Sequence, residues 1–134
     1  MAETVEFELV SPARLLMSED VEMVVVPGMD GDIGVLPGHS LLITTVRPGV
    51  IDVHEGGKVK DSIFVAGGFC EVSPERCTVL AEEAMPLDKI DKSDADKRLS
   101  EAQETLSSAD DDDKEEAETE VKVAEAMVAA AGRG

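Results

Sequence analysis

The sequence has few of the side chains that carry chemistry, and it has no long apolar run. It contains two histidines and two cysteines, and 12 basic residues face 30 acidic ones. No segment approaches the roughly 18 uncharged apolar residues of a membrane-spanning helix, so direct membrane insertion is not expected. The first residues alternate acidic and apolar side chains without a basic start, unlike a secretory signal peptide.

The shortage of basic residues extends along the whole chain. Residues 1–87 contain 15 acidic and 5 basic side chains and residues 88–134 contain 15 and 7, which gives the net charge of -18. Such a surface repels nucleic acid phosphates and anionic lipids, so no nucleic acid binding is expected. It favours a basic protein partner or serves solubility, and solubility is the commoner reason.

The two histidines do not form a catalytic site. Neither His39 nor His54 has a Ser, Cys or carboxylate at the spacing of a nucleophile and its base, so no catalytic residue and no cofactor is predicted. His39 follows a Pro-Gly pair and is either a loop histidine in water or a contact residue. The contact becomes the favoured interpretation once the resemblance described below is considered.

The cysteines and the glycine-flanked aspartates do not predict a metal site. Cys70 and Cys77 flank a turn, one place out of direct opposition, and are interpreted as small core residues. Asp30 and Asp32 suggest a calcium loop, but the distal Glu is absent, with Leu41 twelve residues along. The glycines also lack the spacing of a phosphate-binding loop, so we interpret them as turn residues.

The first two thirds of the chain show the periodicity of strands. Residues 5–9 alternate apolar and acidic side chains, as a half-buried strand does. Similar patterns recur at residues 21–26, 40–46, 50–54, 58–65, 68–73 and 76–82. Strands this short, with no helix between them, predict an antiparallel β-sandwich or flattened barrel over residues 1–86.

After Pro86 the period lengthens to that of a helix. Apolar residues recur at steps of three and four, at Ala95, Leu99, Ala102 and Leu106 and again at Ala117, Val121, Ala124, Val128 and Ala131. Residues 87–134 are therefore predicted to form a two-helix hairpin, with its reversal at residues 107–110. The four aspartates at 110–113 are interpreted as a solvated helix start. Alanine-rich seams bury little area, so the hairpin must lean on the sandwich or on a partner.

One segment carries a family resemblance. Residues 24–42 hold a spaced set of turn and strand residues: Pro27, Gly28, Gly31, Gly34, Val35, Pro37, Gly38 and His39. This spacing resembles the epsilon chain of the rotary ATP synthase. Collinear segments at residues 7–27, 47–53 and 65–84 resemble the same family in the same order, whereas the helical tail matches only in length and type.

The resemblance implies an α+β fold and a non-catalytic function. The chain would be a central-stalk subunit of a bacterial proton-translocating ATP synthase, at the cytoplasmic face of the inner membrane. One sandwich surface would bind the gamma subunit, and the end with the glycine-rich loop would rest on the polar loops of the membrane rotor ring (the c-ring). The catalytic alpha/beta head would carry the active sites, and this chain would couple rotation to synthesis.

The resemblance also implies particular contact residues. Ser11, Asp32 and His39 match family positions at the ring-facing end of the sandwich. Because the ring loops carry arginine, Asp32 is expected to be the charged partner of a partly buried pair.

Some relatives bind ATP through an Ile/Leu-Asp-x-x-Arg-Ala motif on the helical domain. The match here is Ile90, Asp91, Asp94 and Ala95, with Asp94 in the arginine position, and starting from Leu87-Asp88 instead places Asp91 there. Either alignment puts a carboxylate where a cation should face phosphate, so no ATP binding is predicted.

The helical tail of this family inhibits ATP hydrolysis when basic tail residues face an acidic loop of the beta chain. Here residues 109–125 include only two basic side chains, Lys114 and Lys122. The tail is therefore predicted to be a weak inhibitor or none.

Two other functions fit the sequence less well. A free acidic adaptor would explain the charge but not the ordered match of turns. A small hydrolase or metal enzyme would need converging nucleophile, base or ligands, which the separated histidines and cysteines do not supply.

Overall fold

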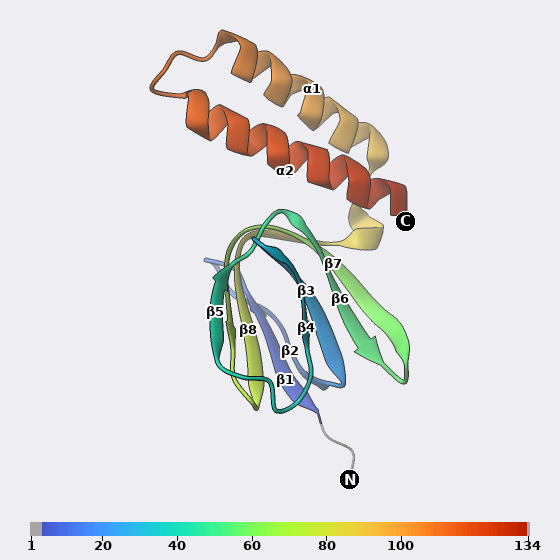
Figure 1. Cartoon of the computed structure of the whole chain (residues 1–134). Coiled ribbons are helices and arrows are strands. Elements are labelled where there is room, and N and C mark those ends of the chain that lie inside the picture. Colours follow the sequence, from blue (N-terminus) through green and yellow to red (C-terminus); the bar gives the residue numbers. More distant parts are fainter. Residues whose placement is uncertain (1–3, 134) are drawn as a thin grey trace. The chain divides into compact units, whose positions relative to one another are not determined.

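The computed structural model describes residues 4–133, and the chain divides after Pro86 into a β unit and a helical unit. The β unit contains eight strands: β1 (Val5–Val10), β2 (Leu15–Val21), β3 (Met23–Gly28), β4 (Gly31–Val35), β5 (Leu42–Thr45), β6 (Gly49–Glu55), β7 (Lys58–Val72) and β8 (Arg76–Pro86). The helical unit contains η1 (Leu87–Lys89), α1 (Lys92–Ser108) and α2 (Lys114–Arg133). Figure 1 shows both units along the chain.

The strands form a β-sandwich whose sheet does not close. The strand order is β2-β1-β8-β7-β6-β3-β4, with β5 paired to β7 outside this path, so the flattened barrel is excluded. All pairs are antiparallel except β1 with β8, which are parallel. The exception arises because β1 and β8 are joined through the whole sandwich rather than by a hairpin, so no tight turn fixes their direction.

The long strands β7 and β8 take part in both layers of the sandwich. Their pairing runs from Ile63↔Pro86 to Val72↔Cys77, although the pair bends at Gly67 and Gly68. Gly68 has φ +110°, and a Cβ built on it would lie 1.7 Å from the Leu80 carbonyl oxygen. Only a residue without a side chain fits this approach, so Gly68 permits the bend that lets one strand pair serve two layers.

The core consists mainly of aliphatic residues on alternating strand positions. Val5, Phe7 and Leu9 of β1 are buried, as their alternation predicts. Burial of every second residue is what an amphipathic strand of a sandwich requires, because its other face stays in water.

The two cysteines belong to this core. Cys70 and Cys77 are buried and free, with their Sγ atoms 3.8 Å apart. Cys70 pairs with Val79 and Cys77 with Val72, so the cysteines are two places out of opposition rather than one. Contact with Cys70 and desolvation raise the pKa of the Cys77 thiol, which therefore stays protonated as a core residue.

Three strand predictions differ from the structure. The strands β2 and β4 were not predicted, because β2 is mostly exposed and the glycines of β4 were interpreted as turns. The predicted strands at 58–65 and 68–73 are one strand, β7, because glycine bends it without ending its pairing. In the hairpin, α2 buries Val123, Met127 and Ala130 beside the predicted Ala117 and Ala124. The other predicted residues of this stripe are only half-buried: Val121, Val128 and Ala131.

Candidate interaction surfaces

The β3–β4 turn is fixed by contacts with the connection between β5 and β6. The Arg47 N–H donates to the Pro27 carbonyl at 2.9 Å, and the Met29 N–H donates to the Thr45 carbonyl at 2.9 Å. The Arg47 guanidinium donates from Nη1 to the Gly28 carbonyl and from Nη2 to Asp32 Oδ1, each at 2.6 Å. One arginine thus joins both sides of the turn. The sequence analysis included Arg47 only in the segment 47–53 that resembles the family, and it did not predict this role.

Ser11 and Asp32 lie toward the same end of the sandwich. Paired neighbours run from Val10 through Leu80 and Phe69 to Thr45, which accepts from Met29 in the β3–β4 turn. Ser11 follows Val10, and its hydroxyl and backbone close a turn with Arg14.

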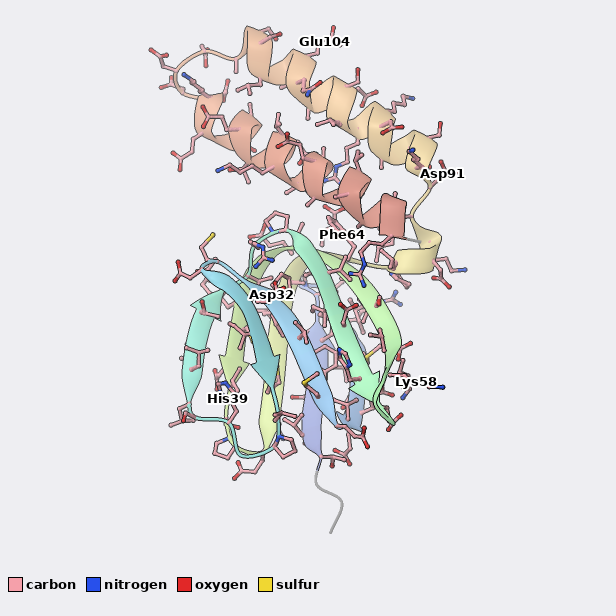
Figure 2. All side chains as sticks on the ribbon, turned by 45° about the vertical axis from the view of Figure 1, so that its right-hand side comes forward. Asp32, His39, Lys58, Phe64, Asp91 and Glu104 are labelled. Carbon is pink, nitrogen blue, oxygen red and sulfur yellow. The ribbon has the colours of Figure 1, made fainter. Side chains whose placement is uncertain are left out.

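His39 lies at the opposite end. Gly38 donates its N–H to the Pro74 carbonyl in the β7–β8 turn at 2.8 Å, whereas Asp32 lies near the start of β4 and the rest of that strand separates it from the His39 loop. Figure 2 labels Asp32 and His39 at opposite ends of the strands. The expectation that Ser11, Asp32 and His39 share one end is therefore wrong for His39. His39 Nδ1 lies 2.7 Å from the Ser40 carbonyl oxygen.

An exposed apolar row crosses the outer face of one layer. Phe69 is paired with Leu80, Leu80 with Val10, and Val10 with Leu15, on the strands β7, β8, β1 and β2. Phe69 is 57% exposed, Leu80 49% and Leu15 54%. The face continues along β5 through Ile43, 72% exposed, to Leu41, 79% exposed and close to the His39 loop. Contiguous apolar surface of this kind marks a protein interface.

Sequence reasoning missed the apolar row, although its signal was present. Phe69 and Leu80 each stand one place from a buried residue, Cys70 and Val79. Strand alternation therefore directs both side chains outward. Their alignment depends on the register between strands, which periodicity within one strand does not give.

The residues that match the degraded nucleotide motif form the start of α1. Asp91 is the N-cap, and its Oδ1 accepts from the Asp94 N–H at 3.1 Å. Ala95 is buried, and Asp94 stays exposed in the first turn. Ile90 donates its N–H to the Leu87 carbonyl of η1 at 3.2 Å. An acidic cap and a carboxylate in the first turn both suit the positive end of a helix.

No group of three or more metal-ligating side chains occurs within residues 4–133. Likewise, neither helix of the described chain is long and apolar enough to cross a membrane.

Comparison with known proteins gives a consistent assignment. The family model described as the ATP synthase delta/epsilon chain β-sandwich domain matches residues 4–87. The ATP synthase epsilon chain of Paramagnetospirillum magneticum is 58% identical over 97% of this chain and 98% of its own length, and that of Rhodospirillum rubrum is 56% identical over the same shares.

A solved structure agrees with this assignment. A chain in the cryo-EM structure of the Euglena gracilis mitochondrial ATP synthase, which includes OSCP, F1 and the c-ring, matches with a TM-score of 0.82 and 28% identity. The match covers 95% of this chain and 81% of that one. The present chain therefore belongs to the ATP synthase epsilon chain family and is a non-catalytic subunit.

Proposed function

We propose that this chain couples rotation of a membrane rotor ring to the catalytic head, as a peripheral subunit of the central stalk at the cytoplasmic face of a bacterial inner membrane. The observation that carries the proposal is the exposed apolar row on the sandwich of a chain in this family. A monomer that worked alone would leave this surface in water. The matched Euglena chain comes from an assembly that contains a c-ring.

The apolar row is the proposed contact with the gamma subunit. It crosses paired strands of a packed sandwich, so its side chains are held in place before binding. Burial of such residues drives association without requiring opposite charge, which suits a partner that must stay bound during rotation. The His39 loop lies beside the same face, through Leu41.

The end that carries Ser11 and Asp32 is the proposed contact with the polar loops of the c-ring. Its β3–β4 turn is acidic and is fixed to the β5–β6 connection by Arg47. The strands β7 and β8 stay paired through both layers, so load applied at this end is carried by a packed sheet pair.

Sedimentation tests the proposal against a free acidic adaptor. The native protein is expected to sediment with the ATP synthase head and to leave it only under dissociating conditions. A protein that sediments alone at every salt concentration, while the head stays intact, would favour the adaptor.

Asp32→Lys is expected to weaken the ring contact. The change replaces attraction by repulsion and breaks the ion pair with Arg47. Each exposed pair contributes about 0.2 to 1 kcal/mol, so reversal costs more than Asp32→Ala. The readout is proton-coupled ATP synthesis in vesicles that contain the reconstituted complex. Unchanged assembly and synthesis would exclude Asp32 from the contact.

The helical tail is expected to inhibit ATP hydrolysis weakly or not at all. Residues 109–125 carry Lys114 and Lys122 against nine carboxylates, at Asp110 to Asp113, Glu115, Glu116, Glu118, Glu120 and Glu125. Insertion of the tail against the acidic loop of the beta chain would remove water from carboxylates that face other carboxylates, which is unfavourable. Truncation after Pro86 should leave hydrolysis by the complex unchanged, and a severalfold rise would contradict this.

Reversal of the charge of the tail glutamates tests why inhibition is weak: either the acidic tail is repelled by the beta chain, or the tail has the wrong shape to insert. Replacement of Glu115, Glu116, Glu118 and Glu120 by Lys should create inhibition if repulsion prevents insertion. Because Glu120 pairs with Arg98 at 2.7 Å within the hairpin, a triple variant that keeps Glu120 is the matched control for hairpin stability.

The chain is expected not to bind ATP at physiological concentration. Asp91 is occupied as the helix cap, and Asp94 places a carboxylate where phosphate would need a cation. Titration calorimetry with the full chain should show no heat of binding up to millimolar ATP. A sub-millimolar site would overturn the expectation.

A further inference from the structure

The two cysteines form a close pair of thiols inside the sandwich. Cys70 on β7 and Cys77 on β8 are both fully buried and free, and their Sγ atoms lie 3.8 Å apart. The sequence contains no other cysteine, so no further thiol competes for either of them. Two thiols in contact can be joined by the removal of two electrons and two protons, which makes this pair a candidate site of oxidation.

The register places the two cysteines diagonally across the paired strands. Cys70 is opposite Val79, and Cys77 is opposite Val72. The Cβ atoms of diagonal neighbours are typically somewhat less than about 7 to 8 Å apart, whereas a disulfide joins Cβ atoms about 4 Å apart. A bridge between the cysteines therefore requires a local shift of β7 against β8. A bridge between directly opposed residues would not require this shift.

The strand positions beside the cysteines carry part of the exposed apolar row. Phe69 precedes Cys70 and is paired with Leu80, which follows Val79. Successive side chains of a strand point to opposite faces, so Phe69 and Leu80 are exposed where Cys70 and Val79 are buried. A local shift of β7 against β8 would therefore displace two side chains of the proposed contact with the gamma subunit.

The two thiols are not equivalent. A hydrogen bond from the Cys77 thiol lowers the pKa of Cys70, whereas the same contact and desolvation raise the pKa of Cys77. Cys70 is therefore the thiol that reacts first, since the thiolate is the nucleophilic form. Burial excludes large or charged oxidants. A hydroperoxide is small and uncharged, so local opening of the β7–β8 turn is sufficient to admit it.

We propose that Cys70 and Cys77 form a reversible disulfide when the chain meets hydrogen peroxide, and that this bridge weakens the attachment of the chain to the gamma subunit. The bridge itself is independent of the proposed function, whereas its effect on binding rests on the proposed gamma contact. A reducing cytosol keeps the pair as thiols at rest and restores them after oxidation.

The reaction proceeds in two steps. The Cys70 sulfur attacks one peroxide oxygen and breaks the O–O bond, which forms a sulfenic acid on Cys70. The other oxygen leaves as hydroxide and becomes water with the proton of the Cys70 thiol. The Cys77 sulfur then attacks the Cys70 sulfur and displaces its hydroxyl group, which leaves as a second water with the proton of Cys77. The two thiols lose two electrons in total, and the peroxide gains them.

An exchange of two residues gives a matched control. The double variant Cys77→Val/Val79→Cys keeps the composition of the chain but places the second cysteine directly opposite Cys70. Each reduced full-length chain is treated with hydrogen peroxide, and the bridge is detected by the mass of the intact chain and by the loss of both thiols to alkylation. Both chains are expected to lose two hydrogens and to recover both thiols in dithiothreitol.

The effect of the bridge on binding is measured by competition with the reduced wild-type chain for ATP synthase from which this subunit has been removed. Oxidised wild type is expected to bind at least about fivefold more weakly than reduced wild type, whereas the oxidised double variant should stay within about twofold of its reduced form. The single variant Cys77→Val cannot form the bridge and keeps the exposed Met29, so it controls for oxidation of methionine. Its binding should not change on treatment.

Several results would overturn the proposal. They are a wild-type chain that does not form the bridge, a bridged wild-type chain that binds as the reduced chain does, and equal losses of binding by wild type and the double variant. A loss of binding by treated Cys77→Val that equals the wild-type loss would assign the effect to another residue. Failure of the gamma contact looks different, because the reduced Phe69→Asp chain would then bind normally while the bridge would still form in wild type.

Discussion

Gly68→Ala is expected to remove most of the stability of the β-sandwich. The new Cβ would lie 1.7 Å from the Leu80 carbonyl oxygen, and backbone rather than a flexible side chain occupies that position. The φ of +110° is also unfavourable for alanine and costs about 1 to 3 kcal/mol by itself. Relief of the overlap must separate β7 from β8, so the total loss should exceed about 4 kcal/mol, a large part of the stability of an ordinary domain.

Gly34→Ala is the matched control for this prediction. Gly34 lies in β4, and a Cβ built there has no neighbour within 4 Å and no positive φ to strain it. The free energy of unfolding of the Gly34→Ala chain should stay within about 0.5 kcal/mol of the wild-type value. Denaturant unfolding of the full chain, followed by the amide spectra of core residues, distinguishes the two variants. A Gly68→Ala chain within about 1 kcal/mol of wild type would mean that the β7–β8 bend adapts at little cost.

Local pattern predicted the fold class and the location of the helices, but not the pairing that builds the surfaces. Alternation in residues 5–9 identified a half-buried strand, because burial on one face leaves a period of two in the sequence. The strand β2 was missed because it lies at the edge of the sheet, where exposure weakens that period. The parallel pairing of β1 with β8 leaves no local signal at all.

The candidate contact residues could likewise be identified from the sequence, but their positions relative to one another could not. The family resemblance selected Asp32, yet it placed His39 at the same end because sequence order does not show that most of β4 separates them. Arg47 is distant in sequence from Asp32, and only the adjacent β3–β4 turn and β5–β6 connection bring the two together. Asp91 was noted only as part of a nucleotide motif that lacks its arginine, and its role as the cap of α1 was not predicted.

Phe69→Asp should abolish stable association with the ATP synthase while leaving the chain folded. Phe69 is 57% exposed, so the change removes little packing from the free chain. At an interface with the gamma subunit the phenyl ring would be buried, and its loss costs about 1.5 to 3 kcal/mol. An unpaired carboxylate beside Leu80 adds a desolvation penalty of several kcal/mol.

For Phe69→Asp, the lost burial of the phenyl ring and the desolvation penalty together correspond to at least about a hundredfold weaker binding. The measurement is competition with the wild-type chain for ATP synthase from which this subunit has been removed. Val59→Asp is the matched control, because Val59 is an apolar residue of the same strand, 48% exposed, on the half of β7 that pairs with β6. The Val59→Asp chain should bind as wild type does.

The outcomes for the two variants distinguish the possible explanations. If both variants bind normally, the gamma subunit contacts some other surface. If both fail to bind, the loss reflects acidic charge rather than the apolar row. Only selective failure of Phe69→Asp supports the row as the face that anchors this subunit to the stalk, because the two substitutions change net charge equally and differ in the face that carries them.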